Sequence, residues 1–196
     1  MNKEFLETIK AEDGRLFHLA YHQKRFEQTL LAFGLTHVPQ LHDLLSPPEK
    51  GLYRCRVLYS CTNFTVSYHP YVKRNVHSLK LIYDDTIEYT YKYADREKLN
   101  AHFLQKEQAD DILIIKNQQV TDTSIANIAF FDGERWFTPK TPLLKGTTRE
   151  RLLDLHKIYE KDISVASLQQ YKKVALLNAM IDFDIISEDK HKGLYC

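Results

Sequence analysis

The 196-residue sequence is poor in glycine and cysteine, and each shortage excludes a class of site. None of its six glycines forms the pattern G-x-G-x-x-G, G-x-x-x-x-G-K-[ST] or G-x-S-x-G, so neither a glycine-rich phosphate loop nor a nucleophile elbow is expected. Its three cysteines are odd in number and form no C-x-x-C pair. We therefore expect neither a disulfide framework nor a zinc site, and a reducing compartment fits this cysteine usage.

The sequence also lacks a large net charge and a long apolar run. Lys and Arg total 27 and Asp and Glu total 26, so no strong field is available to attract nucleic acid or an anionic membrane. No apolar run is long enough to span a bilayer, and the charged start, residues 1–10, does not resemble a signal peptide. We therefore predict a cytoplasmic protein with no nucleic-acid or membrane partner.

The first part of the chain has the periodicity of a small sheet with two helices. Asp13-Gly14 is a turn signal between two short apolar runs, and it predicts a hairpin. Apolar residues at helical spacing predict one helix over residues 20–33 and a shorter one near residues 41–45. The expected strands are residues 5–9, 15–19, 52–59, 64–68 and 79–83.

The second part is also mixed. Asp132-Gly133 predicts a two-residue hairpin turn, and residues 147–150 form a capping box that starts a helix running to residue 159. Another helix is expected over residues 94–105, and the expected strands are residues 88–91, 111–115, 127–131, 135–137, 173–177 and 183–186. Because strands and helices do not alternate regularly, we predict an α+β fold with lobes of residues 1–84 and 85–196, not a doubly wound parallel sheet.

Three local patterns have both a plain and a functional interpretation. His18 and His22 have the spacing of two metal ligands on a helix, but no third ligand is indicated, so no metal site is expected. Arg54 and Arg56 share one face of a predicted strand, which is either a solvated surface or a wall that binds carboxylates. Residues 146–148 precede a helix, whose first N–H groups either are only capped or bind phosphate.

In their order along the chain, these features resemble the motifs of the class IV aminotransferases. The matching segments are Phe5–Ile9 with Asp13-Gly14, His22-x-x-Arg25-Phe26, Tyr91–Arg96, Ala109–Leu113, Val120–Asp122 with Ala126–Ile128, Thr138-Pro139 with Leu144–Arg149, and Leu177–Met180. The resemblance implies the two-lobed fold of the D-amino acid aminotransferase-like (fold type IV) enzymes, with pyridoxal 5'-phosphate between the lobes. Compared with the family's usual pattern, this chain is shortened at both its N-terminal and C-terminal ends.

The resemblance also implies roles for individual residues. Lys92 is expected to form a Schiff base with the cofactor, which a lysine does only as the free amine. Asp122 is expected to face the pyridine nitrogen, where the family normally has glutamate. The residues expected to bind the phosphate or pack on the ring are Arg25, Leu144, Gly146, Thr147, Thr148, Asn178 and Ala179. The residues expected to bind a substrate carboxylate are Arg96, Arg54 and Arg56.

Two details favour the aminodeoxychorismate lyase branch of the family: the pair Asn178-Ala179, and the spacing from Lys92 to Arg96. Enzymes of that branch eliminate pyruvate from 4-amino-4-deoxychorismate and give 4-aminobenzoate for folate synthesis. One alternative is an aminotransferase that acts on branched-chain or D-amino acids. Another is a degenerate, non-catalytic member that works as a binding partner. The resemblance implies a homodimer and a small substrate with amino and carboxylate groups.

Overall fold

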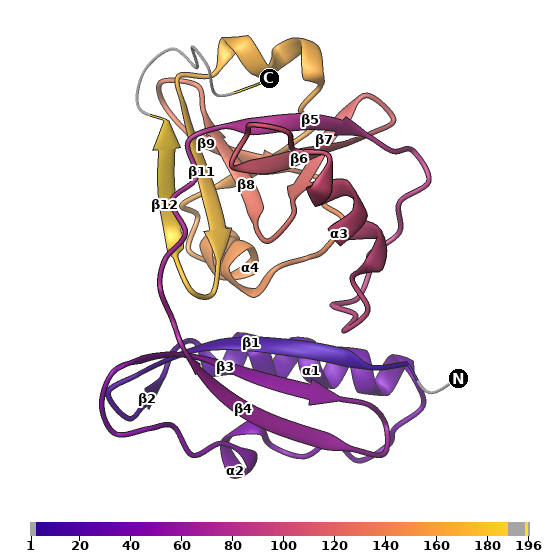
Figure 1. The fold of residues 1–196 in the computed structure, drawn as a ribbon, viewed down its shortest axis with the longest axis vertical. Coiled ribbons are helices and arrows are strands. Elements are labelled where there is room, and N and C mark those ends of the chain that lie inside the picture. The colour runs from indigo at the N-terminus through magenta and orange to yellow at the C-terminus, as the bar shows by residue number, and fades with distance from the viewer. Residues whose placement is uncertain (1–2, 188–194, 196) are drawn as a thin grey trace. The chain divides into compact units, whose positions relative to one another are not determined.

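The computed structural model describes residues 3–187 and 195, and its contacts divide the chain into two compact units (Figure 1). The first unit is Met1–Lys73 with Tyr91–Asp95, and the second is Arg74–Thr90 with Arg96–Cys196. This division differs from the boundary predicted between residues 84 and 85. Strand β5 (Leu79–Tyr83) pairs with β6 (Asp111–Lys116) and therefore belongs to the second unit, whereas residues 91–95 return to the first.

The first unit is an antiparallel sheet with the strand order β2-β1-β3-β4, and helix α1 packs on one of its faces. The strands are β1 (Phe5–Glu12), β2 (Arg15–Leu16), β3 (Leu52–Tyr59) and β4 (Phe64–Pro70), and the helices are α1 (Leu19–Ala32) and α2 (Leu41–Leu44). All six elements were expected from the periodicity, so the sequence predicts this unit well.

The core of the first unit lies between its sheet and α1. Ile9, Cys55 and Val57 are fully buried, whereas the residues that alternate with them on β1 and β3 point to the other face of the sheet. Phe26 and Leu30, one turn apart on α1, belong to the same buried cluster. A polar residue on the inner face of β1 therefore needs hydrogen-bonding partners on α1.

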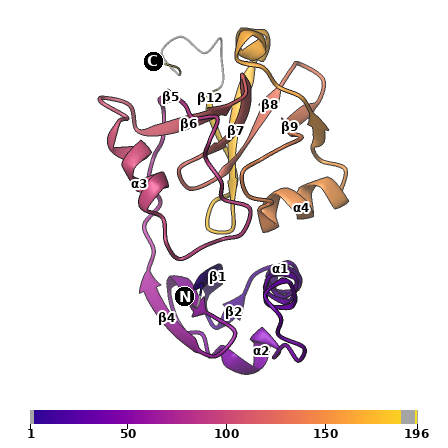
Figure 2. The same ribbon diagram turned by 90° about the vertical axis from the view of Figure 1, so that its right-hand side faces the viewer.

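The second unit is built on a sheet with the order β10-β9-β8-β7-β6-β5, and β11 pairs with both β8 and β12. Figure 2 shows β5 to β9 of this sheet together with α3 and α4. The remaining strands are β7 (Gln119–Thr123), β8 (Asn127–Phe131), β9 (Trp136–Pro139), β10 (Tyr159–Lys161), β11 (Lys173–Asn178) and β12 (Asp182–Ser187). A short 3₁₀ helix, η1 (Val165–Gln170), precedes β11. The largest buried cluster of this unit includes Leu113, Ile128, Phe130 and Val174.

The two outermost strand pairs of this sheet are parallel. Helix α3 (Glu97–Leu104) lies in the connection from β5 to β6, and α4 (Thr147–Asp154) lies in the connection from β9 to β10. Parallel neighbours need a long crossover of this kind. The inner pairs are antiparallel, so helices and strands are mixed without regular alternation, and the predicted α+β class is confirmed.

The segment before α3 differs from its prediction. No strand forms at residues 88–91, and α3 begins at Glu97, not near residue 94. The reason is that this segment bonds to β1: Phe5 and Tyr93 form a bridge, and the N–H of Ala94 donates to the carbonyl of Glu4 at 2.9 Å. Residues 91–95 thus extend one edge of the first sheet, and the helix starts only after they leave it.

Helix α4 also begins and ends differently from its prediction. Its N-cap is Gly146, and no side-chain hydrogen bond caps the helix, so the predicted capping box is not formed. The helix ends at Asp154, not near residue 159, because His156 has a φ of 52°, a left-handed conformation that helices do not continue. Residues 159–161 then pair with β9.

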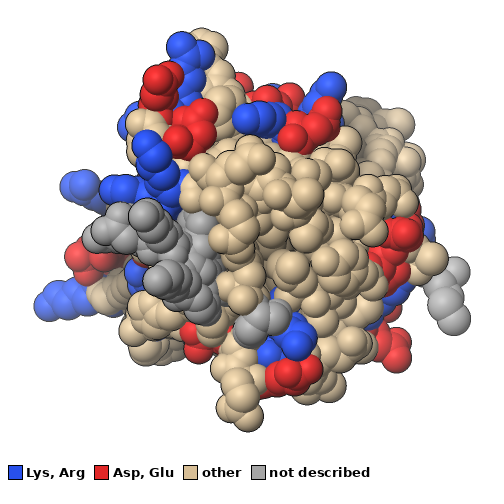
Figure 3. Space-filling view, turned by 90° about the horizontal axis from the view of Figure 1, so that it is seen from above, with Lys and Arg blue, Asp and Glu red and all other residues tan. Residues whose placement is uncertain are grey.

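The surface carries charges of both signs. On the face shown in Figure 3, Lys and Arg side chains lie near Asp and Glu side chains around the margin, and uncharged residues cover the centre. This mixture agrees with the formal net charge of +1. Among the residues that the structure describes, no helix is long and apolar enough to cross a membrane.

Candidate functional site

A buried charge cluster lies on the inner face of the first unit. Glu7 of β1 is 0% exposed, and its carboxylate accepts two hydrogen bonds from Arg25, at 2.8 Å from Nε and 2.6 Å from Nη2. The Nδ1 atom of His22 lies 2.7 Å from Oε2 of the same carboxylate. His22 and Arg25 are three residues apart on α1, so both point at β1 from one side of the helix.

Burial and the contacts among its members together set the charges of this cluster. Burial alone would raise the pKa of Glu7, but Arg25 and His22 outweigh it and lower that pKa to about 2. Burial lowers the pKa of His22 below its ordinary value, although the bond to Glu7 opposes this. At neutral pH the cluster is therefore an ion pair of Glu7 and Arg25 beside a neutral imidazole.

Lys92 belongs to the same unit and is fixed next to this cluster. The N–H of Leu6 donates to the carbonyl of Lys92 at 2.8 Å, which holds the main chain of Lys92 on the edge of β1, one residue from Glu7. A charge on Lys92 is also the smallest of the causes that lower the pKa of His22. The structure thus places Lys92 and Arg25, both predicted to bind the cofactor, in the same unit.

A second polar network lies in the second unit, around Asp122. One carboxylate oxygen accepts from the N–H of Leu144 at 2.9 Å, and the other accepts from Nδ2 of Asn127 at 2.7 Å. The same amide nitrogen donates to the carbonyl of Leu144 at 2.8 Å, and Oδ1 of Asn127 accepts from the N–H of Gly146 at 3.1 Å. Asp122, Leu144 and Gly146, all predicted site residues, are therefore connected through Asn127.

Asp122 titrates much closer to neutrality than an ordinary aspartate. Its side chain is buried, and this burial raises its pKa to about 6, although the bonds from Leu144 and Asn127 and the charge of Arg149 oppose the shift. A carboxylate with few water contacts interacts strongly with a nearby cation. Asp122 can therefore accept a hydrogen bond from a protonated ring nitrogen, as its predicted role requires.

Thr147 and Thr148 begin α4 directly after Gly146, and both side chains are buried. The first N–H groups of a helix and the positive end of its dipole favour an anion. Arg149, the next residue, is also buried and holds the helix in place, because its Nη2 atom donates to the carbonyl of Pro139 at 2.9 Å and to Glu160 at 2.6 Å. These two contacts therefore fix the start of the helix.

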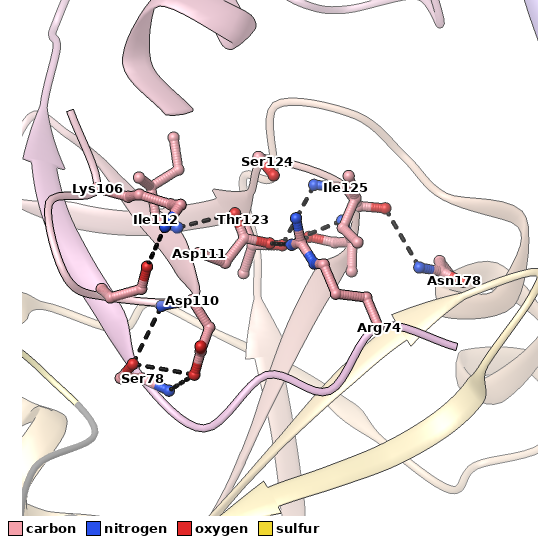
Figure 4. Close-up of polar contacts among 12 residues, drawn as sticks. Arg74, Ser78, Lys106, Asp110, Asp111, Ile112, Thr123, Ser124, Ile125 and Asn178 are labelled. Carbon is pink, nitrogen blue, oxygen red and sulfur yellow. Dashed lines mark hydrogen bonds and ion pairs between the residues drawn. The ribbon is translucent and has the colours of Figure 1, made fainter. Parts of the chain in front are cut away.

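Two further predicted residues, Arg96 and Asn178, hold the turn that follows Asp122. Nη2 of Arg96 donates to the carbonyl of Ser124 at 2.7 Å. Nδ2 of Asn178 donates to the carbonyl of Ile125 at 3.4 Å (Figure 4). Oδ1 of Asn178 also accepts from two backbone N–H groups of the β11–β12 turn, which contains Ala179. Both residues thus have a structural role near Asp122, in addition to any ligand contact.

Arg54 and Arg56 are separated from the Lys92 cluster. They alternate on β3 with Cys55 and Val57, whose side chains face α1, so the two arginines lie on the opposite face of the first sheet. Glu7 pairs with Val57 and shares its inner face. Within this unit, the arginines therefore do not belong to the site that Lys92 and Arg25 form.

Sequence reasoning missed two residues that organise these clusters, Glu7 and Asn127. Both lie inside segments that resemble family motifs, but neither was given a role. A glutamate within an apolar strand and an asparagine at the start of another were the available signals. A buried polar residue of this kind needs partners, and here those partners are predicted site residues.

Comparisons with known proteins find relatives over most of the chain. The family model described as amino-transferase class IV matches residues 89–188. An uncharacterized protein of Haemophilus influenzae is 36% identical over 180 residues, which cover 89% of this chain and 96% of that protein. A crystal structure from Haemophilus somnus 129PT, provisionally named a 4-amino-4-deoxychorismate lyase, is 36% identical with a TM-score of 0.84, and the match covers 92% of this chain and 97% of that one.

The likeness of fold extends to more distant proteins. A hypothetical aminotransferase of Mycobacterium tuberculosis, in its PLP-bound form, is 16% identical and has a TM-score of 0.81. The match covers 99% of this chain and 84% of that one. Fold type IV is therefore the architecture of this chain, and solved structures of that architecture include forms that hold pyridoxal phosphate.

Proposed function

Because the chain belongs to the class IV aminotransferase family of pyridoxal-phosphate-dependent enzymes, we propose that it is a 4-amino-4-deoxychorismate lyase. The observation that carries the proposal is the arrangement of the first unit, where the main chain of Lys92 is bonded to Leu6, next to the buried Glu7 that binds Arg25. The lyase reaction is supported by the provisional name of the Haemophilus somnus relative and by the pair Asn178-Ala179. The same family membership leads us to propose a homodimer in the cytoplasm.

The residues of both clusters have the chemistry that pyridoxal phosphate needs. Lys92 supplies an amine for the aldehyde of the cofactor. Arg25 and the start of α4, with Thr147 and Thr148, supply donors for the phosphate, and Asp122 supplies a carboxylate for the ring nitrogen. When bound, the cofactor supplies a cationic ring that withdraws electrons from the substrate carbon bonded to nitrogen.

In the proposed reaction, Lys92 acts as both base and acid. Its amine removes the proton from the ring carbon that bears the amino group of the substrate. The bond between the ring and the enolpyruvyl oxygen then breaks, and the proton is returned to the leaving group, which is released as pyruvate. Asp122 stabilises the positive charge on the cofactor ring, and the neutral His22 adds no positive charge beside Lys92.

The test is to incubate the purified protein with pyridoxal phosphate, reduce it with borohydride and identify the modified peptide by mass spectrometry. We expect modification at Lys92, its loss in Lys92→Ala, and no change in Lys50→Ala, which removes an exposed lysine of the same unit. Pyruvate release from 4-amino-4-deoxychorismate, without an amino acceptor, then identifies the lyase. Pyruvate release that survives Lys92→Ala would contradict the mechanism.

Two other results would contradict the proposed lyase function and identify another function in its place. Transfer of an amino group from a branched-chain or D-amino acid to a 2-oxo acid, without pyruvate release from aminodeoxychorismate, would identify an aminotransferase. A protein that stays colourless and shows no borohydride-dependent modification would be a member that binds no cofactor. Light scattering of the purified chain would test the homodimer.

A further inference from the structure

Asn127 faces Asp122 because of the register of two strands. Asp122 on β7 and Asn127 at the start of β8 are directly paired, and a four-residue turn joins them. Side chains that are opposite each other in an antiparallel pair lie on the same face of the sheet, within reach of a hydrogen bond. The turn itself is closed by Thr123, whose N–H donates to the carbonyl of Ala126 at 2.9 Å.

The amide of Asn127 occupies the space beside Gly146. A Cβ atom built on Gly146 would lie 2.1 Å from Oδ1 of Asn127 and 3.2 Å from its Cγ, so no side chain fits there while the amide stays in place. The amide cannot move away without cost, because its nitrogen bonds both Asp122 and the carbonyl of Leu144. An ordinary side chain at position 146 would therefore disturb Asp122 through Asn127.

The backbone conformation of Gly146 does not itself require glycine. Its φ of −74° and ψ of 147° are extended values that any residue adopts. Of the five glycines whose surroundings the structure describes, the other four have positive φ, so Gly146 differs from them. The reason for glycine at this position is therefore steric, and Asn127 is the neighbour that the missing side chain would meet.

We propose that Asn127 is a positioning residue, which holds the Asp122 carboxylate and the start of α4 in one hydrogen-bonded arrangement and requires glycine at position 146. The proposal rests on the proposed function for the roles of Asp122 and α4 toward the cofactor. It links the two ends of the cofactor through one side chain, because Asp122 serves the ring nitrogen and α4 serves the phosphate.

The hydrogen bonds of Asp122 oppose the effect of burial on its pKa. The groups that favour its ionised form are the N–H groups of Leu144 and Leu143, the amide of Asn127 and the charge of Arg149. Removal of the Asn127 amide takes away the only side-chain donor among them, so the carboxylate should hold its proton to higher pH. A methyl group at position 146 should have the same effect indirectly, by displacing that amide.

The experiment is to titrate the carboxyl carbon of Asp122 by NMR in the full chain without cofactor, with the resonance assigned from Asp122→Asn. We expect Asn127→Ala and Gly146→Ala each to raise the pKa of Asp122 by roughly one pH unit, which corresponds to the loss of one hydrogen bond to a charged group. The double variant should show no larger rise than Asn127→Ala alone, because no amide is left to displace. Asn100→Ala, an exposed asparagine on α3, is the control and should cause no change.

Two results would overturn the proposal: an unchanged pKa of Asp122 in Asn127→Ala, or effects of the two substitutions that add in the double variant. If Asn127→Ala does not fold, Asn127→Ser replaces it, since a hydroxyl group is too short to meet a methyl group at position 146. Borohydride modification of Lys92 in the unmodified sequence is measured in parallel. Failure of that reaction with a normal NMR result refutes the proposed function alone, whereas the reverse outcome refutes the role of Asn127 alone.

Discussion

Glu7 binds Arg25 through both oxygens of its carboxylate, with the Nε and Nη2 atoms of the guanidinium 2.8 Å and 2.6 Å away. Two parallel hydrogen bonds fix the planar guanidinium group of Arg25. Contacts within the first unit therefore set its orientation. The carboxylate is fully buried, and the arginine side chain is 13% exposed. An arginine oriented in this way is ready to bind an anion without first losing its freedom of rotation.

The first prediction concerns the stability that this pair provides. Glu7→Gln should lower the free energy of unfolding by about 3 kcal/mol, because it leaves the charge of Arg25 without a buried partner. Glu12→Gln is the matched control on the same strand, since Glu12 is 39% exposed and pairs with Lys10, and it should change stability by less than about 0.5 kcal/mol. Urea unfolding of both variants gives the comparison, and equal losses would contradict it.

The second prediction concerns the loss of folding stability at low pH. The pKa of Glu7 is lowered from 4.5 to about 2 in the folded protein, so the unfolded chain takes up this proton first. The stability from Glu7 is therefore complete above about pH 4.5 and is lost as the pH falls toward 2. The lowered pKa of His22 adds a loss with the same sign, which begins below about pH 6.5. Urea unfolding between pH 7 and 3 should show a steeper loss in the natural sequence than in Glu7→Gln.

The third prediction has the opposite sign and concerns Asp122. Its pKa rises from 3.8 to about 6 on folding, so the folded protein holds this proton at a pH where the unfolded chain has released it. The corresponding stability is present below about pH 3.8 and is lost as the pH rises through 6. In the protein without cofactor, Asp122→Asn should remove this dependence. A variant with the same slope between pH 4 and 6 as the natural sequence would show that Asp122 titrates normally.

The fourth prediction concerns a pair of a buried carboxylate and an exposed arginine at the start of the second unit. Asp111 is 0% exposed, and Arg74 donates to it at 2.5 Å, which ties the segment before β5 to the start of β6 (Figure 4). Asp111→Asn should lower the free energy of unfolding by about 2 kcal/mol, because a charged hydrogen bond to a buried carboxylate is lost, whereas Arg74, at 40% exposed, can be hydrated. Glu107→Gln, in an exposed pair with Lys80, is the control and should cost less than about 0.5 kcal/mol. A similar loss in both variants would contradict this assignment.

Strands with a strong period could be predicted from the sequence alone. The bounds of β3, β5 and β8 match the predicted ranges, because their apolar runs end at clear turn signals. Strand β7 was missed as an element. Its hairpin with β6 turns through Asn117 and Gln118, which have φ values of 50° and 62°. This is the conformation that Asn-Gly usually provides, and without the glycine the sequence gives little sign of a turn.

The turn at Asp132-Gly133 was placed correctly but is wider than predicted. The strands on either side pair last at Phe131 and Trp136, so four residues form the loop. The reason is the side chain of Asp132, whose carboxylate accepts from the N–H groups of Glu134 and Arg135, each at 2.9 Å. An aspartate that bonds the backbone ahead of it competes with a tighter turn, and spacing alone does not reveal which geometry forms.

The predicted site residues were reached through the family resemblance, and the contacts that hold them were not. Glu7 lies 18 positions from Arg25, and Asn127 lies 19 positions from Gly146. Periodicity describes neighbours along one element, whereas these partners meet only after the sheets form. The opposite placement of Arg54 and Arg56 follows from the same alternation that defined their strand, once the inner face of the sheet is known.

The return of residues 91–95 to the first unit has a consequence for how the protein can be divided. The chain crosses between units at residues 73–74, 90–91 and 95–96, so the first unit is not a contiguous stretch of the gene. A fragment that ends at residue 73 would lack Lys92 and would leave the edge of β1 near Leu6 without its bonded neighbour. Excision, domain exchange or circular permutation of this protein must therefore carry both pieces together.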